Sequence, residues 1–81
     1  MKSVYVDLSN VNCIKNFASI VSRYDGAFDL IQGRYRVDAK SIVGIFSLDL
    51  SKPVELQIEN ESDDLLRALA RFLVDDKDLR W

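Results

Sequence analysis

Histidine is absent from this 81-residue sequence, and cysteine and proline occur once each, as Cys13 and Pro53. A single cysteine excludes an intramolecular disulfide, and without histidine it cannot build a zinc site. No stretch approaches the roughly 20 apolar residues of a membrane span, and the first residues do not form a targeting signal. We therefore expect a cytoplasmic protein with no membrane anchor, no bound metal and no cofactor.

An excess of basic residues is also lacking, because 11 Lys and Arg stand against 13 Asp and Glu and give a formal net charge of -2. This balance argues against nonspecific nucleic-acid binding, which depends on clustered positive charge. Asp75, Asp76 and Asp78 lack the spacing of a calcium loop, so we interpret them as an acidic tail. The 48% hydrophobic and 30% charged composition predicts one globular domain, residues 1–81.

Alternation of apolar and polar residues predicts four strands. Residues 4–8, 28–30, 35–37 and 54–58 have the two-residue period of a strand with one buried face. The second and third strands flank Gln32-Gly33 and are predicted to form a hairpin.

Apolar residues spaced by three and four predict two amphipathic helices. The first follows a cap at Ser9 or Asn10 and ends near Tyr24, before Asp25-Gly26. Its predicted core positions are Val11, Ile14, Phe17, Ala18 and Val21. The second follows a cap at Asn60 or Ser62. Its predicted core positions are Leu65, Leu69, Phe72 and Leu73.

Residues 41–48 form a short apolar segment that strand and helix patterns fit equally well. The order is then strand, helix, strand, strand, short helix or loop, strand, helix. This is an α+β pattern in which helices cover one face of a mainly antiparallel sheet. The order of the predicted helices and strands does not by itself indicate a function.

The sequence Ala-Lys-Ser-Ile-Val-Gly-Ile-Phe-Ser-Leu at residues 39–48 resembles the regulatory segment of HPr. HPr is the histidine-containing phosphocarrier of the bacterial sugar phosphotransferase system. The family pattern there is Ala-Lys-Ser-Ile-Met-Gly, then an apolar residue, a variable one, Ser or Thr, and Leu. The resemblance implies the HPr-like open-faced β-sandwich, ordered βαββαβα, with three helices over one face of a four-stranded, mainly antiparallel sheet. It also implies that the segment after Ser41 is a helix.

The chain departs from the family where HPr carries Gly-Leu-His-x-Arg-Pro. Counting back from Ser41 without gaps puts Asn10 at the histidine position, Asn12 at the arginine position and Cys13 at the proline position. An amide does not form a readily transferred phosphoramidate, and the guanidinium clamp for phosphate is missing. We therefore expect a degenerate site without histidine phosphocarrier activity.

Ser41 resembles the serine that HPr kinase modifies in HPr and in its catabolite-repression homologue, which also lacks the histidine. The alternative is that Ser41 only caps a helix, although the two roles are compatible. The corresponding helix of HPr docks partners. The resemblance therefore implies partner contacts by Lys40, Ile42, Val43, Ile45 and Phe46. For each apolar side chain, the alternative is burial in the core.

Two other groups of residues have competing interpretations. Cys13 near a helix N-terminus is either a reactive thiol of lowered pKa or an inert side chain filling the place of the proline. Tyr5, Tyr35, Arg34 and Arg36 are compatible with an RNA-stacking sheet face. Glu55, Gln57 and Glu59 on the neighbouring strand favour an ordinary solvated face instead.

These observations predict an HPr-like regulatory adapter, a monomer or weak homodimer, whose partners are an HPr kinase and phosphotransferase or transcriptional regulator proteins. The alternative is a nonphosphorylated structural or decoy domain that binds HPr partners or itself. An enzyme needs a nucleophile, a base or a cofactor, and only Cys13 and scattered carboxylates are present. We therefore do not expect an enzyme.

Overall fold

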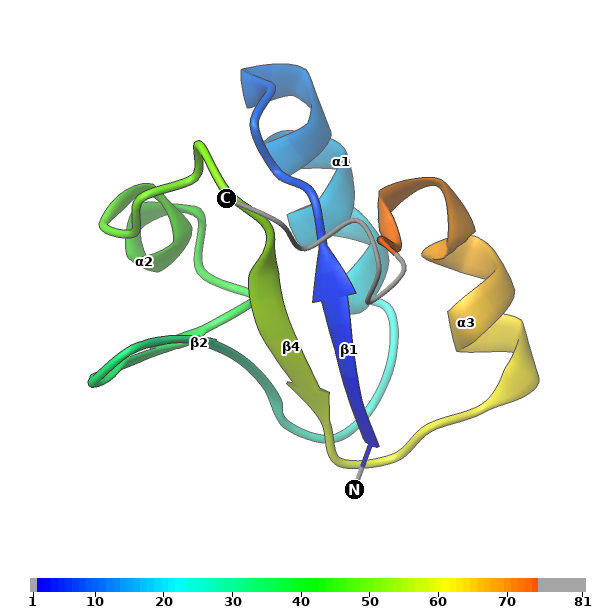
Figure 1. Cartoon of the computed structure of the whole chain (residues 1–81). Helices are drawn as coiled ribbons and strands as arrows, with labels where there is room; N and C mark the ends of the chain where they lie inside the picture. Colours follow the sequence, from blue (N-terminus) through cyan, green and yellow to red (C-terminus); the bar gives the residue numbers. More distant parts are fainter. Residues whose placement is uncertain (1, 75–81) are drawn as a thin grey trace.

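The computed structural model describes residues 2–74 and confirms the predicted α+β architecture. The strands are β1 (Lys2–Val6), β2 (Phe28–Gln32), β3 (Tyr35–Asp38) and β4 (Val54–Ile58). The helices are α1 (Val11–Val21), α2 (Ile42–Phe46) and α3 (Asp63–Ala68), followed by a 3-10 turn, η1 (Ala70–Phe72). In Figure 1, α1 passes behind β1 and β4, with α2 and α3 on either side of it.

The four strands form one antiparallel sheet in the order β1-β4-β2-β3. The predicted hairpin is the β2–β3 pair, closed by Gln32 opposite Tyr35. Gly33 follows with φ +60°. A positive φ at the first central residue only is the geometry of a type II′ turn, which glycine adopts readily.

The core lies between the sheet and the helices. Val54, Leu56 and Ile58 of β4 are buried, as the alternation predicts. The other buried side chains of the same cluster are Val6, Leu8, Ile14, Phe17, Ala18, Val21, Phe28, Leu30, Ala39, Ile45, Leu48, Leu65, Leu69 and Phe72. The Phe17 and Phe72 rings meet edge to face, with centroids 5.6 Å apart, and so join α1 to η1.

Three helix caps are occupied by the residue types that favour them. Asn10 accepts a hydrogen bond from the Asn12 amide, Ser41 from Gly44 and Ser62 from Leu65. These contacts resolve the open alternatives in favour of Asn10 and Ser62. Each side chain satisfies an amide that the helix itself leaves without a partner.

Two predicted core positions are wrong. Val11 is 54% exposed because it occupies the first turn of α1, beyond the region covered by the sheet. Leu73 is also exposed, because α3 ends at Ala68 and the 3-10 turn changes the helical period before Leu73 is reached. Leu8 is buried as predicted, although β1 ends at Val6.

The last described residues return to β1. The Asp7 amide donates to the Phe72 carbonyl at 2.8 Å, and the Val74 amide donates to the Tyr5 carbonyl at 2.9 Å. These bonds frame an antiparallel bridge between Val6 and Leu73. The side of β1 that β4 leaves open is therefore partly paired by residues from the other end of the sequence.

Candidate regulatory and docking site

Ser41 stands at the junction between β3 and α2. Its backbone is extended, with φ -100° and ψ 112°, and its hydroxyl accepts a hydrogen bond from the Gly44 amide at 3.2 Å. The Ser41 amide donates to the Asp38 carbonyl at 3.0 Å. Ser41 is half-buried and fixed by hydrogen bonds on both sides. It is a helix cap, as its residue type predicts, and its hydroxyl is held in a defined position.

Lys40 anchors this junction from within the chain. Its ammonium nitrogen donates to the Tyr24 carbonyl at 2.9 Å and lies 5.4 Å from the centre of the Phe28 ring. Its backbone amide donates to the Asp38 carboxylate at 2.9 Å. Because the ammonium is engaged at the end of α1, contact with a partner through this group requires breaking the Tyr24 bond.

The apolar side chains of α2 divide between core and surface. Ile42, Val43 and Phe46 are exposed to 40%, 83% and 49% respectively. Ile45 is fully buried, so its assignment to the docking surface is corrected: it packs into the core beneath α2. We call Ile42, Val43 and Phe46 the α2 surface. Three large apolar side chains exposed on so short a helix are typical of a protein-contact surface.

Gly44 lies where α2 approaches β3. A Cβ at this position would lie 3.4 Å from the Val37 Cβ and 3.5 Å from the Ser41 hydroxyl oxygen. The Ser47 hydroxyl donates to the Gly44 carbonyl at 2.6 Å at the other end of the helix. Serine hydroxyls therefore bond to the backbone at both ends of α2.

The residues predicted to form a degenerate phosphocarrier site lie at the start of α1, which packs beside α2. Asn10 is used as the cap, Asn12 is exposed, and Cys13 is half-buried against the core. An amide cap satisfies helix donors but offers no ring nitrogen for phosphate. Within residues 2–74, no group of three or more potential metal ligands is found.

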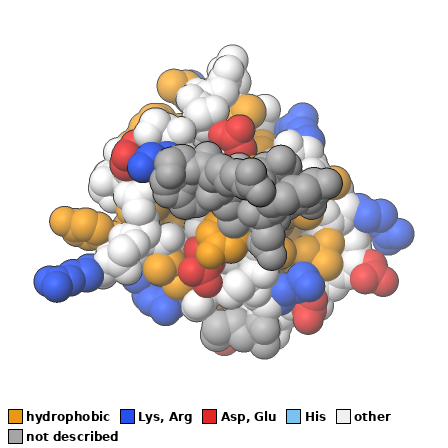
Figure 2. Space-filling view, viewed as in Figure 1, with side chains coloured by type: hydrophobic (Ala, Val, Ile, Leu, Met, Phe, Trp, Pro, Cys, Tyr) orange, Lys and Arg blue, Asp and Glu red, His pale blue; other side chains and the backbone are white. Residues whose placement is uncertain are grey.

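The residues suggested for an RNA-stacking face do not form a basic platform. Arg36 donates to the Asp29 carboxylate at 2.8 Å and to the Gln57 side chain at 3.3 Å. Tyr35 is 70% exposed at the edge strand β3, whereas Tyr5 is half-buried on the opposite edge of the sheet. Figure 2 shows basic and acidic side chains interspersed on the side of the molecule in view. The predicted solvated face agrees with this arrangement.

The described helices are also too short or too polar to cross a bilayer. The acidic tail predicted at Asp75, Asp76 and Asp78 lies outside the described residues.

Sequence reasoning missed two features near these residues. Gln32 clamps the backbone of Asp49 with two hydrogen bonds, one donated to its carbonyl and one accepted from its amide. On the other face of the sheet, Tyr5, Ile31, Pro53 and Glu55 line a depression. Only the alternation of these positions was visible in the sequence, and alternation does not tell which strands are neighbours.

The geometry defines the class of protein: an α+β open-faced sandwich with a serine-capped short helix above a four-stranded antiparallel sheet. A family model described as "PTS HPr component phosphorylation site" matches residues 11–74. This match spans most of the sequence, and the chain belongs to the HPr family of the sugar phosphotransferase system.

A solved structure has the same fold. It is HPr-C-His from Thermoanaerobacter tengcongensis, with 25% sequence identity and a TM-score of 0.72, and the match covers 88% of this chain and 89% of that one. The search of curated proteins gave no match.

Proposed function

We propose that this chain is an HPr-like regulatory adapter, in which phosphorylation of Ser41 controls protein binding at the α2 surface. The observation that carries the proposal is the position of the Ser41 hydroxyl, at the cap of the helix that exposes Ile42, Val43 and Phe46. Membership of the HPr family supports it, since the chain is related to phosphocarriers of the phosphotransferase system.

A relay of phosphate through histidine does not fit the residues of the chain. The sequence contains no histidine, and Asn10, which we assign to the histidine position, is a helix cap. The nucleophile that remains there is the Cys13 thiol, which is half-buried against the core. In the proposed function, the protein therefore binds partners and does not carry phosphate to them.

The regulatory step is electrostatic. A phosphoryl group on Ser41 replaces a neutral hydroxyl by roughly -1.5 to -2 charges and three acceptor oxygens next to the first amides of α2. The charge appears beside three exposed apolar side chains, so a partner that covers the α2 surface must accommodate it. A partner with basic groups would bind the phosphorylated form more tightly. An apolar or acidic partner would bind the unmodified form more tightly.

The proposed partners are an HPr kinase and phosphotransferase or transcriptional regulator proteins in the cytoplasm. We propose that residues 1–81 act as one HPr-like domain, as a monomer or weak homodimer, without a cofactor.

The test is incubation of the full chain with HPr kinase and ATP, followed by mass spectrometry of the peptides. We expect one phosphate on Ser41. Ser41→Ala and Ser41→Asn should both remain unmodified, and Asn keeps a side-chain cap for α2. Ser47→Ala is the matched control, because it removes a serine at the other end of the same helix. Absence of phosphate from the wild-type chain would contradict the switch.

A second function, that of a nonphosphorylated decoy that occupies HPr partners or a second copy of the chain, is favoured by the exposure of Val43. This side chain is 83% exposed, so the α2 surface is accessible whether or not Ser41 is modified. Partner binding that is unchanged in Ser41→Asn and lost in Val43→Asp would support this alternative. If the Cys13 thiol carries phosphate, incubation with enzyme I and labelled phosphoenolpyruvate should transfer labelled phosphate to the chain. This label should be absent from Cys13→Ser.

A further inference from the structure

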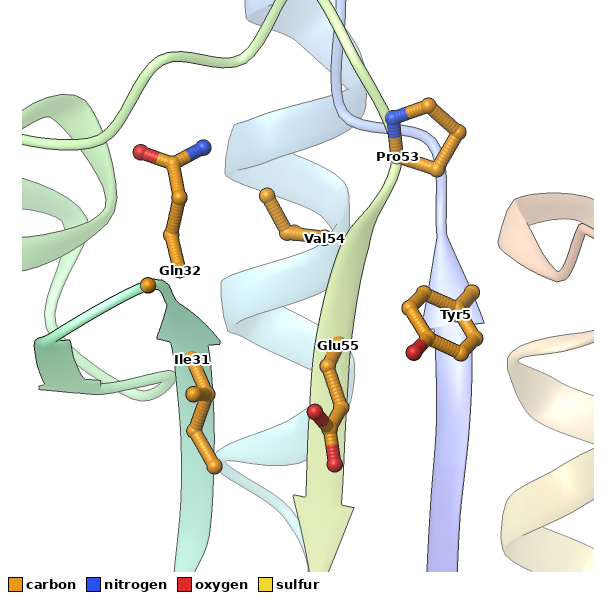
Figure 3. A pocket seen from close by; sticks show the side chains of 7 residues that line it. Tyr5, Ile31, Gln32, Pro53, Val54 and Glu55 are labelled. Carbon is orange, nitrogen blue, oxygen red and sulfur yellow. The ribbon is translucent and has the colours of Figure 1, made fainter. Parts of the chain in front are cut away.

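The face of the sheet opposite the helices contains a row of three side chains from three neighbouring strands. Tyr5 of β1 pairs with Glu55 of β4, and Glu55 pairs with Ile31 of β2. Their chain neighbours Val6, Val54 and Leu30 are buried in the core. Since successive side chains of a strand point to opposite faces, the row projects away from the helices. Figure 3 shows the carboxylate of Glu55 between the Tyr5 ring and Ile31.

This row forms the floor of an open depression of about 280 Å³. Pro53, just before β4, and Gly33, in the β2–β3 turn, also line it. The rim is fixed, because the Gln32 side chain exchanges two hydrogen bonds with the backbone of Asp49, at 2.6 and 2.9 Å. The depression is therefore part of the folded framework, and its size suits one side chain or a small organic molecule.

Glu55 is the one charged side chain among the lining residues of this depression. It is half-buried, and its carboxylate accepts a long hydrogen bond, 3.4 Å, from the side-chain amide of Gln57. Arg36 of β3, which is separated from β4 by β2, is directed to Asp29 at 2.8 Å. The site thus combines a carboxylate with an aromatic ring and two aliphatic walls.

We propose that this depression binds an alkylguanidinium group. The planar cation would form charge-assisted hydrogen bonds to Glu55 and stack on the Tyr5 ring. Its apolar stem would lie against Ile31 and Pro53, in the way that long cationic side chains cover apolar surface. Two sources supply this chemistry, a free guanidinium compound and an arginine side chain of a protein.

The site is independent of the proposed regulation, because it lies on the opposite face of the sheet from α2. Ser41→Asn should leave guanidinium binding unchanged. A failure of one proposal is therefore distinguishable from a failure of the other.

The test is an NMR titration of the 15N-labelled full chain with butylguanidinium and, separately, with a blocked Gly-Arg-Gly peptide. We expect shifts at the amides of Tyr5, Ile31, Gly33 and Glu55, with a dissociation constant on the order of millimolar for so small a ligand. Shifts by butylguanidinium alone would assign a free compound, and equal or stronger binding of the peptide would assign an arginine side chain.

Substitutions separate this site from general surface binding. Glu55→Gln should weaken butylguanidinium binding by about tenfold, since it removes the charge from the hydrogen bonds. Glu61→Gln, which changes an exposed carboxylate outside the depression, should leave it unchanged. Tyr5→Leu should also weaken butylguanidinium binding, because it removes the ring on which the cation stacks while Glu55 stays in place. The chemical shifts of core amides verify that each variant is folded. Equal shifts with uncharged butanol, or full binding by Glu55→Gln, would overturn the proposal.

Discussion

At the scale of single residues, the turn before β4 shows how short contacts set the chemistry of an exposed group. The Asp49 carboxylate accepts hydrogen bonds from the Ser51 hydroxyl at 2.7 Å and from the Ser51 amide at 3.1 Å. The hydroxyl bond, followed by the amide bond, lowers the pKa of Asp49 below its ordinary value of 3.8. The folded chain therefore binds this proton more weakly than the unfolded chain does.

The expected consequence is that Ser51→Ala raises the pKa of Asp49 toward 3.8, while the remaining amide bond keeps part of the shift. The stabilising effect of this lowered pKa is present above pH 3.8 and is lost as the pH falls through the folded pKa. A carboxyl 13C NMR titration of both chains measures the difference. Ser47→Ala, which leaves Asp49 untouched, serves as the control, and an unchanged Asp49 pKa in Ser51→Ala would contradict the assignment.

At the scale of elements, α2 was the hardest to predict. Its short run of apolar residues fits a strand and a short helix equally, and resemblance to a family segment decided the assignment. The same ambiguity explains the error at Ile45: on a helix of 5 residues, apolar side chains occur on both the buried and the exposed sides. By contrast, β4 has one apolar face and was correctly identified from alternation alone.

A substitution in α2 tests how tightly it is packed. Gly44→Ala places a Cβ 3.4–3.6 Å from Val37, Ser41 and Asp38, which are ordinary contact distances. Alanine is favoured over glycine in a helix by about 0.5–1 kcal/mol, so we expect the free energy of unfolding to rise by roughly that amount. Urea unfolding followed by circular dichroism measures it.

The control for that experiment is Gly33→Ala. No atom lies within 4 Å of the added Cβ, but φ is +60°, so only backbone strain acts and stability should fall by about 1 kcal/mol. A lower stability of Gly44→Ala would show that α2 has no room for a methyl group.

At the scale of the whole molecule, one continuous hydrophobic core holds together the helices and the sheet, and with them both proposed sites. A chain of 81 residues has a total stability of only about 4–12 kcal/mol. Phe72 fills the core between η1 and α1 and is 2% exposed. Truncating it removes the ring contact with Phe17 and leaves a cavity.

Phe72→Ala should therefore lower the free energy of unfolding by about 3–5 kcal/mol. Differential scanning calorimetry measures the shift, with Leu73→Ala as the control, because Leu73 is 36% exposed and should change stability by much less. Comparable losses in the two variants would contradict the placement of Phe72 in the core.

The sequence predicted which side chains of each strand face inward, but it did not predict which strands are neighbours. Alternation along β4 identifies Glu55 as outward-facing and contains nothing about Tyr5 or Ile31. These residues meet because β4 inserts between β1 and β2, a choice made by packing of the whole sheet. The proposed regulatory residues lie within one continuous segment, so the sequence alone could suggest them, whereas the depression is assembled from three strands and could not be predicted.

The pairing of β1 has a consequence for how the chain folds while it is being synthesised. Both of its neighbours, β4 on one side and residues 72–74 on the other, are made long after it. β1 is thus synthesised well before either of its hydrogen-bond partners. Contacts between residues so distant in sequence are slow to form, so β1 should stay unpaired in the nascent chain until residues 54–74 have been synthesised.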